Sequence, residues 1–227
     1  MLKSLQAVIL AGGRGTRLGS LGKKIPKAMV DINGTPFIEL LINQLKKNRV
    51  DRFLLLSGYK KEQLINYYKN KKKIVILKGN DNWQTLTRIK KAKKFIRGNF
   101  FLLMYCDNFL INFKLKNFLV LKKKFRSNIF FSVFKKKNRQ KSTIEIHAHK
   151  VSYKKNCKSE FVEVGYMLIN KNFFFKGLRE YKGNKLSDYL EFLSKKNNFI
   201  GRVYKDNFLC IENKKFINET KKYFLKK

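Results

Sequence analysis

The residues best suited to chemistry lie near the start of the chain, where an apolar run ends in a turn rich in glycine and arginine. This turn reads Ala11-Gly12-Gly13-Arg14-Gly15-Thr16-Arg17. Glycines leave the backbone amides at a strand end open to an anion, and the planar fork of an arginine matches phosphate oxygens. Pro26-Lys27 adds a second cation shortly afterwards. Two adjacent glycines alone would indicate a tight turn with nothing bound, but Arg17 and Lys27 favour a phosphate site.

A carboxylate comes after another apolar segment much later in the chain. Asp107 stands directly after the run Asn99–Tyr105 and Cys106. The carboxyl ends of strands in α/β sheets are where such folds place the groups that handle ligands. Asp107 is therefore a candidate for the same site as the glycine-rich turn. The alternative is an aspartate that caps a helix or forms a turn.

For these residues to meet, the chain between them must fold as alternating strands and helices. Apolar runs predict strands, and apolar residues at helical spacing predict helices. We expect strands at Gln6–Leu10, Phe53–Leu56, Lys73–Leu77 and Asn99–Tyr105, and helices after Pro36, at Lys61–Tyr68 and at Thr85–Ile96. This alternation predicts an α/β fold, a Rossmann-like three-layer sandwich with a mostly parallel mixed sheet. Strand-like runs at Ile129–Phe134, Thr143–Ala148 and Phe161–Ile169 predict a mixed, partly antiparallel extension.

The composition is that of one soluble globular domain with an unusual charge. The chain has 227 residues, of which 44% are hydrophobic, so it can bury a proper core. No apolar run reaches the length of about 18 residues that a membrane span needs. The 53 lysines and arginines outnumber 15 acidic residues, which invites a nucleic-acid or membrane-surface interpretation. Because the lysines are spread over the whole length, we interpret them as a solvated surface rather than a polyanion site. Three scattered cysteines favour a reducing, cytoplasmic setting.

The glycine-rich turn and the segment after it resemble the sugar-phosphate nucleotidyltransferase family. The family signature, Leu-Ala-(Ala or Gly)-Gly-x-Gly-x-Arg-Leu with a later Pro-Lys, is matched by Leu10-Ala11-Gly12-Gly13-Arg14-Gly15-Thr16-Arg17-Leu18 and Pro26-Lys27. The likeness covers roughly residues 6 to 70, is nearest to the subgroup that activates heptose or mannose 1-phosphate with a guanylyl group, and is thinner beyond residue 110. It implies a nucleotide-diphospho-sugar transferase fold. It also implies an enzyme that joins a sugar 1-phosphate to a nucleoside triphosphate and releases pyrophosphate. The nucleotide sugar would supply surface polysaccharide or lipopolysaccharide synthesis.

The resemblance also implies roles for individual residues. Arg17 would hold the β- and γ-phosphates, Lys27 would lie near the α-phosphate, and Asp107 would bind Mg²⁺. Nucleotide contacts are implied for Leu10, Ala11, Gly12, Gly13, Gly15, Thr16, Arg17, Gln84 and Thr85. Sugar-phosphate contacts are implied for Lys155, Glu163 and Gly165. A single domain is expected, with residues 1–110 binding the nucleotide and residues 111–227 binding the sugar phosphate.

One position departs from the family pattern. Active relatives carry a second Mg²⁺-binding aspartate near the carboxyl end, and Cys210 takes its place here, with Glu212 two residues later. A neutral thiol is a poor ligand for Mg²⁺.

Three hypotheses about function remain open. The chain is an active enzyme, a weakened relative that acts as a nucleotide-sugar binding or regulatory subunit, or a nucleic-acid or membrane-surface binding protein. No specific nucleic acid and no membrane span are expected, and the oligomeric state is left open.

Overall fold

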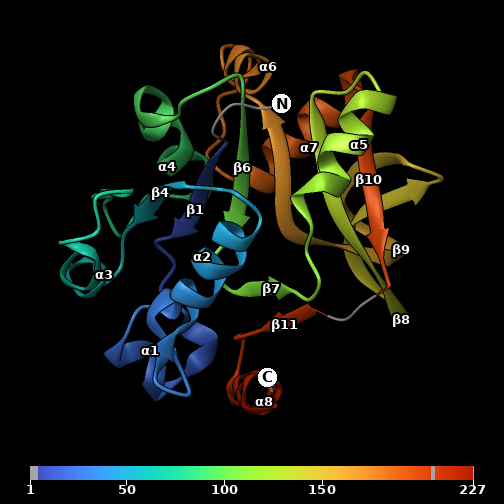
Figure 1. The fold of residues 1–227 in the computed structure, drawn as a ribbon. Coiled ribbons are helices and arrows are strands. Elements are labelled where there is room, and N and C mark those ends of the chain that lie inside the picture. The colour runs from blue at the N-terminus through green and yellow to red at the C-terminus, as the bar shows by residue number, and fades with distance from the viewer. Residues whose placement is uncertain (1–4, 206–207, 227) are drawn as a thin grey trace.

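The computed structural model describes residues 5–205 and 208–226, without the side chains of residues 137–141 and 155. Its largest sheet has seven strands in the order β10-β8-β9-β6-β1-β4-β5 (Figure 1). Their bounds are β1 Gln6–Ala11, β4 Arg52–Ser57, β5 Ile74–Leu77, β6 Phe100–Tyr105, β8 Ile129–His147, β9 Lys150–Asn170 and β10 Phe199–Tyr204. Within the described part of the chain, no helix is long and apolar enough to cross a membrane.

The first half of the sheet is parallel, as the alternating sequence pattern predicts. β1 pairs in parallel with β4 on one side and with β6 on the other, and β4 pairs in parallel with β5. The carboxyl ends of these four strands therefore meet at one edge of the sheet. The glycine-rich turn after β1 and Asp107 after β6 both lie at that edge. In the sequence, Ala11 at the end of β1 and Asp107 are 96 residues apart.

The second half is mixed, which confirms the expected antiparallel extension, but its strands are longer than the sequence suggests. The run at 129–134 and residues 143–147 of the next run belong to one strand, β8, which pairs antiparallel with β9. β10 pairs in parallel with β8 and antiparallel with β9. Because each of these three strands pairs with the other two, the sheet folds back on itself here and departs from a plain Rossmann-like sandwich. Register shifts between β8 and β9 mark irregularities that allow such bending.

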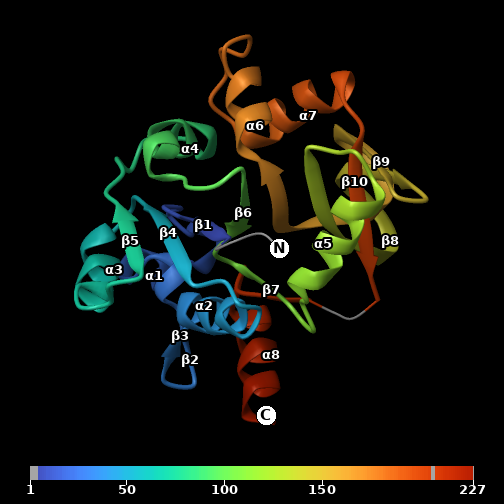
Figure 2. The ribbon, with the colours of Figure 1, turned by 45° about the horizontal axis from the view of Figure 1, so that its top comes forward.

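Helices cover both faces of the sheet and bury two separate hydrophobic cores. On β1, Ala7 and Ile9 belong to one core and Val8 and Leu10 to the other, as alternation along a strand dictates. The first core is covered by α2 (Phe37–Lys47), α3 (Lys61–Tyr68), α5 (Leu115–Lys124) and α8 (Lys214–Leu225). The second is covered by α4 (Thr85–Ala92), α6 (Lys171–Gly177) and α7 (Leu186–Lys196). Figure 2 shows α4, α6 and α7 on the side of the strands opposite α2 and α3.

A short ribbon brings the carboxyl-terminal segment beside the strand edge. β7 (Asn108–Leu110) pairs antiparallel with β11 (Phe208–Cys210), and Ile211 N donates to Asp107 O at 3.1 Å. Thr220 Oγ1 on α8 donates to Cys210 O at 3.2 Å, which joins the last helix to the ribbon. The turn after β1 and the carboxyl-terminal segment thus contribute to the same edge. Shorter elements, η1 (Thr16–Leu18), α1 (Ser20–Lys24), η2 (Lys27–Met29), η3 (Lys93–Phe95), β2 (Asp31–Ile32) and β3 (Thr35–Pro36), complete the described fold.

Candidate active site

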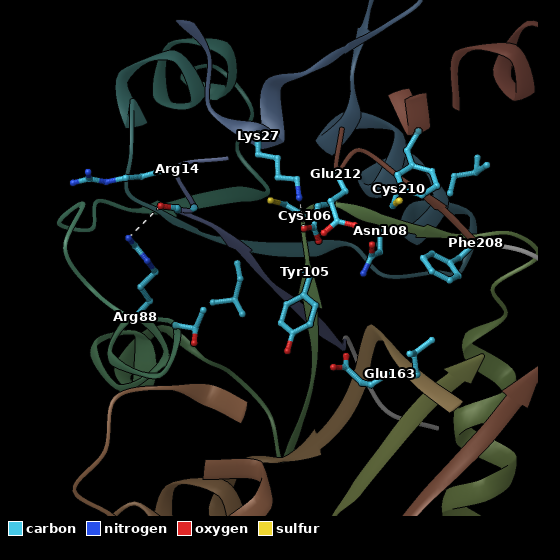
Figure 3. A pocket seen from close by; sticks show the side chains of 18 of the residues that line it. Arg14, Lys27, Arg88, Tyr105, Cys106, Asn108, Glu163, Phe208, Cys210 and Glu212 are labelled. Carbon is cyan, nitrogen blue, oxygen red and sulfur yellow. Dashed lines mark hydrogen bonds and ion pairs between the residues drawn. The ribbon is translucent and has the colours of Figure 1, made fainter. Parts of the chain in front are cut away.

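A pocket of about 1100 Å³ opens at the carboxyl edge of the parallel strands. It collects most of the residues that the sequence singles out: Leu10, Gly12, Gly13, Lys27, Gln84, Thr85, Asp107 and Glu163 line it. Ala11, Gly15, Thr16, Arg17 and Gly165 are not among its lining residues. Lys155 lies on β9, but its side chain is outside the described part. Residues from both halves of the chain therefore share one cavity (Figure 3).

The three glycines of the turn have different surroundings. Gly15 has φ +62°, a left-handed conformation that favours glycine. Around Gly13, a Cβ would meet no atom within 4 Å, so this position faces open space in the pocket. A Cβ on Gly12 would instead overlap the guanidinium of Arg88. Only Gly13 therefore fits the expectation that a missing side chain leaves room for a ligand.

Lys27 and Asp107 meet in the middle of the pocket. Lys27 Nζ donates to Asp107 Oδ2 at 2.7 Å, and their side chains are 15% and 31% exposed. Lys27 begins the 3-10 turn η2 directly after extended Pro26, and its Cβ lies against the left-handed Gly15. The glycine-rich turn thus fixes where this lysine stands. A partly shielded ammonium is suited to aligning an anionic phosphate, and the carboxylate beside it is suited to binding a cation.

The two arginines of the turn have different neighbours. Arg17 forms an ion pair with Glu212, which lines the pocket, although Arg17 itself does not. Its side chain is 74% exposed. Arg14 does line the pocket, and its Nη2 donates to Asn82 Oδ1 at 3.3 Å. The structure therefore brings both arginines to the rim, one paired with the carboxyl-terminal segment and the other with the loop before α4.

Cys210 stands beside Asp107 through the β7–β11 ribbon. It pairs with Asn108 and lines the pocket. Burial and the nearby Asp107 carboxylate raise the pKa of the Cys210 thiol to about 11, so it stays protonated at neutral pH. Glu212 and Glu219 lie further along the same segment and line the same wall. The carboxyl-terminal wall therefore offers a neutral thiol close to Asp107 and carboxylates a little further along.

Glu163 on β9 is held at the opposite wall by a small polar network. Its Oε1 accepts from Gly165 N at 2.6 Å, and the Tyr105 hydroxyl is its side-chain hydrogen-bond partner. Burial raises the pKa of Glu163 to about 7, although these hydrogen bonds oppose the rise. Gly165 has φ +79°, and a Cβ there would overlap the Tyr105 ring. Gly165 therefore orients Glu163 and Tyr105 rather than lining the pocket itself.

The residues that the sequence does not single out are mostly apolar or lie on later strands. Phe134 on β8 and Phe208 on β11 pack edge to face, with ring centroids 5.3 Å apart. Further unforeseen lining residues are Asp81, Asn82, Arg88, Tyr105, Asn108, Lys136, Val162, Leu209, Phe216, Glu219 and Thr220. Most of them have no motif to mark them. The position of Arg88, one turn after Thr85 on a helix at the strand edge, is the signal that could have found it.

Acidic residues are concentrated in the pocket although the chain is strongly basic. Five of the 15 acidic residues line it: Asp81, Asp107, Glu163, Glu212 and Glu219. Only four of the 53 basic residues do so: Arg14, Lys27, Arg88 and Lys136. The pocket wall is thus close to neutral, and the positive charge lies elsewhere. Such a wall is not the basic groove expected of a nucleic-acid binding surface.

Comparisons with known proteins agree on one family. The model of the nucleotidyl transferase family matches residues 6–144. A bifunctional protein GlmU of Methanococcus aeolicus is 31% identical over 207 residues, which are 87% of this chain and 49% of that protein. A D-glycero-alpha-D-manno-heptose 1-phosphate guanylyltransferase of Campylobacter jejuni is 36% identical over 102 residues, 44% of this chain and 46% of that protein. The chain thus spans about half the length of these two curated relatives.

Solved structures give the same result over nearly the whole chain. The crystal structure of HddC from Yersinia pseudotuberculosis complexed with GMP-PN has a TM-score of 0.77 and 27% identity. The match covers 97% of this chain and 99% of the HddC chain. A UDP-glucose pyrophosphorylase complexed with UDP-glucose has a TM-score of 0.80 at 17% identity, covering 99% of both chains, and supports the fold alone. The similarity to these solved structures therefore extends over the folded-back half of the sheet as well as the parallel half.

The raised pKa of Glu163 leads to a pH-dependent stability. Because the carboxyl binds its proton up to about pH 7 in the folded chain but only to about 4.5 when unfolded, its contribution to stability falls as pH rises between those values. The free energy of unfolding of Glu163→Gln, measured relative to that of the parent, should rise by about 2 kcal/mol when the pH is raised from 5 to 8. Urea unfolding at both pH values measures this. Glu62→Gln, at an exposed position on α3, is the control. An unchanged difference between parent and Glu163→Gln would contradict the assignment.

Proposed function

The chain belongs to the nucleotidyl transferase family, and from this we propose that it joins a sugar 1-phosphate to a nucleoside triphosphate and releases pyrophosphate. What carries the proposal is one pocket that holds the glycine-rich turn, Lys27, Asp107 and Glu163 together. The similarity to a heptose 1-phosphate guanylyltransferase supports a heptose, mannose or related sugar phosphate as the acceptor. We further propose a cytoplasmic role in making precursors of surface polysaccharide or lipopolysaccharide.

In this proposal the nucleotide occupies the end of the pocket formed by residues before 110. Gly13 leaves space beside the turn, and Gln84 and Thr85 form the opposite wall at the start of α4. Leu10 and Gly12 also line this end, and Ala11, Gly15 and Thr16 would shape it through the turn to which they belong. Thr85 Oγ1 accepts from Leu186 N at 3.1 Å, so α7 holds this wall in place. A nucleoside seated here would direct its phosphates toward Lys27.

The reaction needs positioning and charge screening more than proton transfer. A sugar phosphate is already an anionic nucleophile at neutral pH, and its oxygen displaces pyrophosphate from the α-phosphorus of the triphosphate. Lys27 would face the α-phosphate, where charge develops, and Arg17 would take the β- and γ-phosphates that leave. In the structure both cations are paired with carboxylates, Asp107 and Glu212. Substrate phosphates would replace these carboxylates as the partners of Lys27 and Arg17.

The donor set around Asp107 fits a magnesium ion held with few protein ligands. In the described ranges, no group of three or more His, Cys, Asp or Glu side chains could enclose a metal. Mg²⁺ prefers oxygen, keeps several waters and commonly binds through one or two carboxylates together with substrate phosphates. When bound, it would neutralise phosphate charge, which a nearly neutral pocket wall does not do alone. Asp107 would hold it, and the protonated Cys210 thiol would contribute little.

The acceptor would occupy the other end of the pocket, formed by residues after 110. Glu163 faces it from β9 and would accept hydrogen bonds from sugar hydroxyls. Gly165 would act through Glu163 and Tyr105. For Lys155 we propose a contact with the sugar 1-phosphate, on the family pattern alone. The division of one domain near residue 110 into a nucleotide part and an acceptor part is proposed on the same grounds.

We expect pyrophosphate release in a screen of GTP, CTP, UTP, dTTP and ATP against heptose, mannose, glucose and glucosamine 1-phosphates with Mg²⁺. Asp107→Asn should keep the fold and lose at least 90% of this turnover, because the amide carries no charge for a cation. Circular dichroism checks the fold of the variant. Release of pyrophosphate by none of the pairs would leave the binding-subunit alternative. Near-parental turnover in Asp107→Asn would refute the metal assignment.

The signature position predicts unequal effects for the two arginines of the turn. Arg17→Ala should raise the KM for the triphosphate at least tenfold, because it removes a charged partner of the leaving phosphates. Arg14→Ala should change the same KM less than threefold, since its side chain contacts Asn82 at the rim. Steady-state kinetics with the preferred triphosphate measures both. Equal and mild effects would reduce the turn to a structural role.

The thiol at position 210 predicts a raised metal requirement. Cys210→Asp should lower the Mg²⁺ concentration for half-maximal turnover several-fold, because it adds a carboxylate next to Asp107. Cys210→Ser, which adds an uncharged oxygen, is the matched control and should change it little. A magnesium titration of the three proteins decides the matter. If Cys210→Asp and Cys210→Ser respond alike, the missing carboxylate is not what limits the site.

A further inference from the structure

Arg88 carries a buried guanidinium between the ends of three neighbouring strands. The residue is 5% exposed, yet it lines the pocket. Its Nη2 donates to Gly12 O at 3.2 Å and to Asp81 O at 3.4 Å, and its Nη1 donates to Ser57 O. These carbonyls stand just after β1, at the end of β4 and after β5, and the three strands are adjacent in the sheet. One side chain from α4 thus ties together the three loops at that corner of the strand edge.

The glycines around this guanidinium show that the chain is shaped to admit it. A Cβ on Gly12, Gly58 or Gly79 would overlap Arg88, and each glycine stands after one of the three strands. None of these three glycines has a positive φ. At Gly79 a Cβ would also strike Ser57 O, but at Gly12 and Gly58 the three atoms nearest to an added Cβ all belong to the guanidinium. Space for Arg88, rather than backbone conformation, therefore explains glycine at these two positions.

The hydrogen bonds described for the Arg88 guanidinium all go to backbone carbonyls. Burial lowers the pKa of Arg88 from its ordinary value, and the nearby Asp81 carboxylate opposes part of that effect. Keeping a guanidinium away from water is unfavourable unless its hydrogen bonds are well made. Carbonyls from three loops satisfy this only while all three stay in place. Arg88 therefore couples the position of the Gly12 carbonyl to those of the other two loops.

We infer that Arg88 is a positioning residue for the nucleotide, which fixes the glycine-rich turn at the base end of the pocket by anchoring Gly12 to the loops after β4 and β5. This inference rests on the proposed function. Figure 3 shows Arg88 and Arg14 at one end of the pocket, with Glu163 and Phe208 at the other. Arg88 thus acts on the part of the pocket where the turn and the start of α4 meet, and leaves the acceptor end alone.

Direct nucleotide binding separates this role from general stability. We expect Arg88→Met to weaken binding of the preferred triphosphate at least tenfold by isothermal titration calorimetry, while KM for the acceptor phosphate changes less than twofold. Arg88→Lys should fall close to Arg88→Met, because an ammonium lacks the planar fork that reaches carbonyls on separate loops. Arg97→Met, at an exposed position, is the control and should bind as the parent does. Parental affinity in a folded Arg88→Met would overturn the inference.

A glycine substitution tests the same idea while keeping the arginine. Gly58→Ala should displace the guanidinium and weaken triphosphate binding several-fold in the parent, but add less than twofold to Arg88→Ala, where the space is free. Independent, multiplying losses would overturn the inference. Binding without pyrophosphate release in the parent would defeat the proposed function while these comparisons still decide the role of Arg88. A parent that binds none of the five triphosphates would overturn both.

Discussion

The contact between Lys27 and Asp107 is the interaction on which the arrangement of the site depends. It joins two positions 80 residues apart, and it can form only because β1 and β6 lie next to each other in parallel. Lys27 is held against Gly15, and Asp107 is held by the Ile211 amide from the carboxyl-terminal ribbon. The sheet order, the left-handed glycine and the last segment of the chain therefore all converge on one ion pair.

The charge of the pocket around this ion pair differs from that of the protein as a whole. The protein as a whole carries a formal charge of +38, but the pocket contains a third of its acidic residues. A generally basic surface attracts phosphates from a distance without selecting among them. Inside the pocket, Lys27 is already paired with Asp107, and Arg17 at the rim is paired with Glu212. In the proposed reaction, selectivity for a phosphorylated substrate would depend on exchange of partners at Lys27 and Arg17, rather than on an excess of positive charge.

Much of the first half of the fold can be predicted from the sequence because its signals are local. The helix at Lys61–Tyr68 has the bounds that the sequence indicates. The bounds of β1, β4, β5 and β6 differ by one residue at one or both ends from those expected from the sequence. In the second half, β8 joins two runs that the sequence separates, because long-range pairing with β9 continues through polar residues. Local hydrophobic pattern does not report such pairing. The folded-back corner, and with it Phe134, could not be foreseen for this reason.

The candidate site shows the same division. The family pattern points to Lys27, Asp107 and Glu163, and the structure brings all three to one pocket. The helical spacing from Thr85 could have placed Arg88 at the strand edge, but no motif connects it to Gly12, and their contact exists only in the folded sheet. In one short turn, Gly15 is required by its backbone angle, Gly13 leaves open space, and Gly12 admits a side chain from α4. A glycine-rich motif therefore predicts a close approach, but only the fold determines whether a ligand or the protein itself makes it.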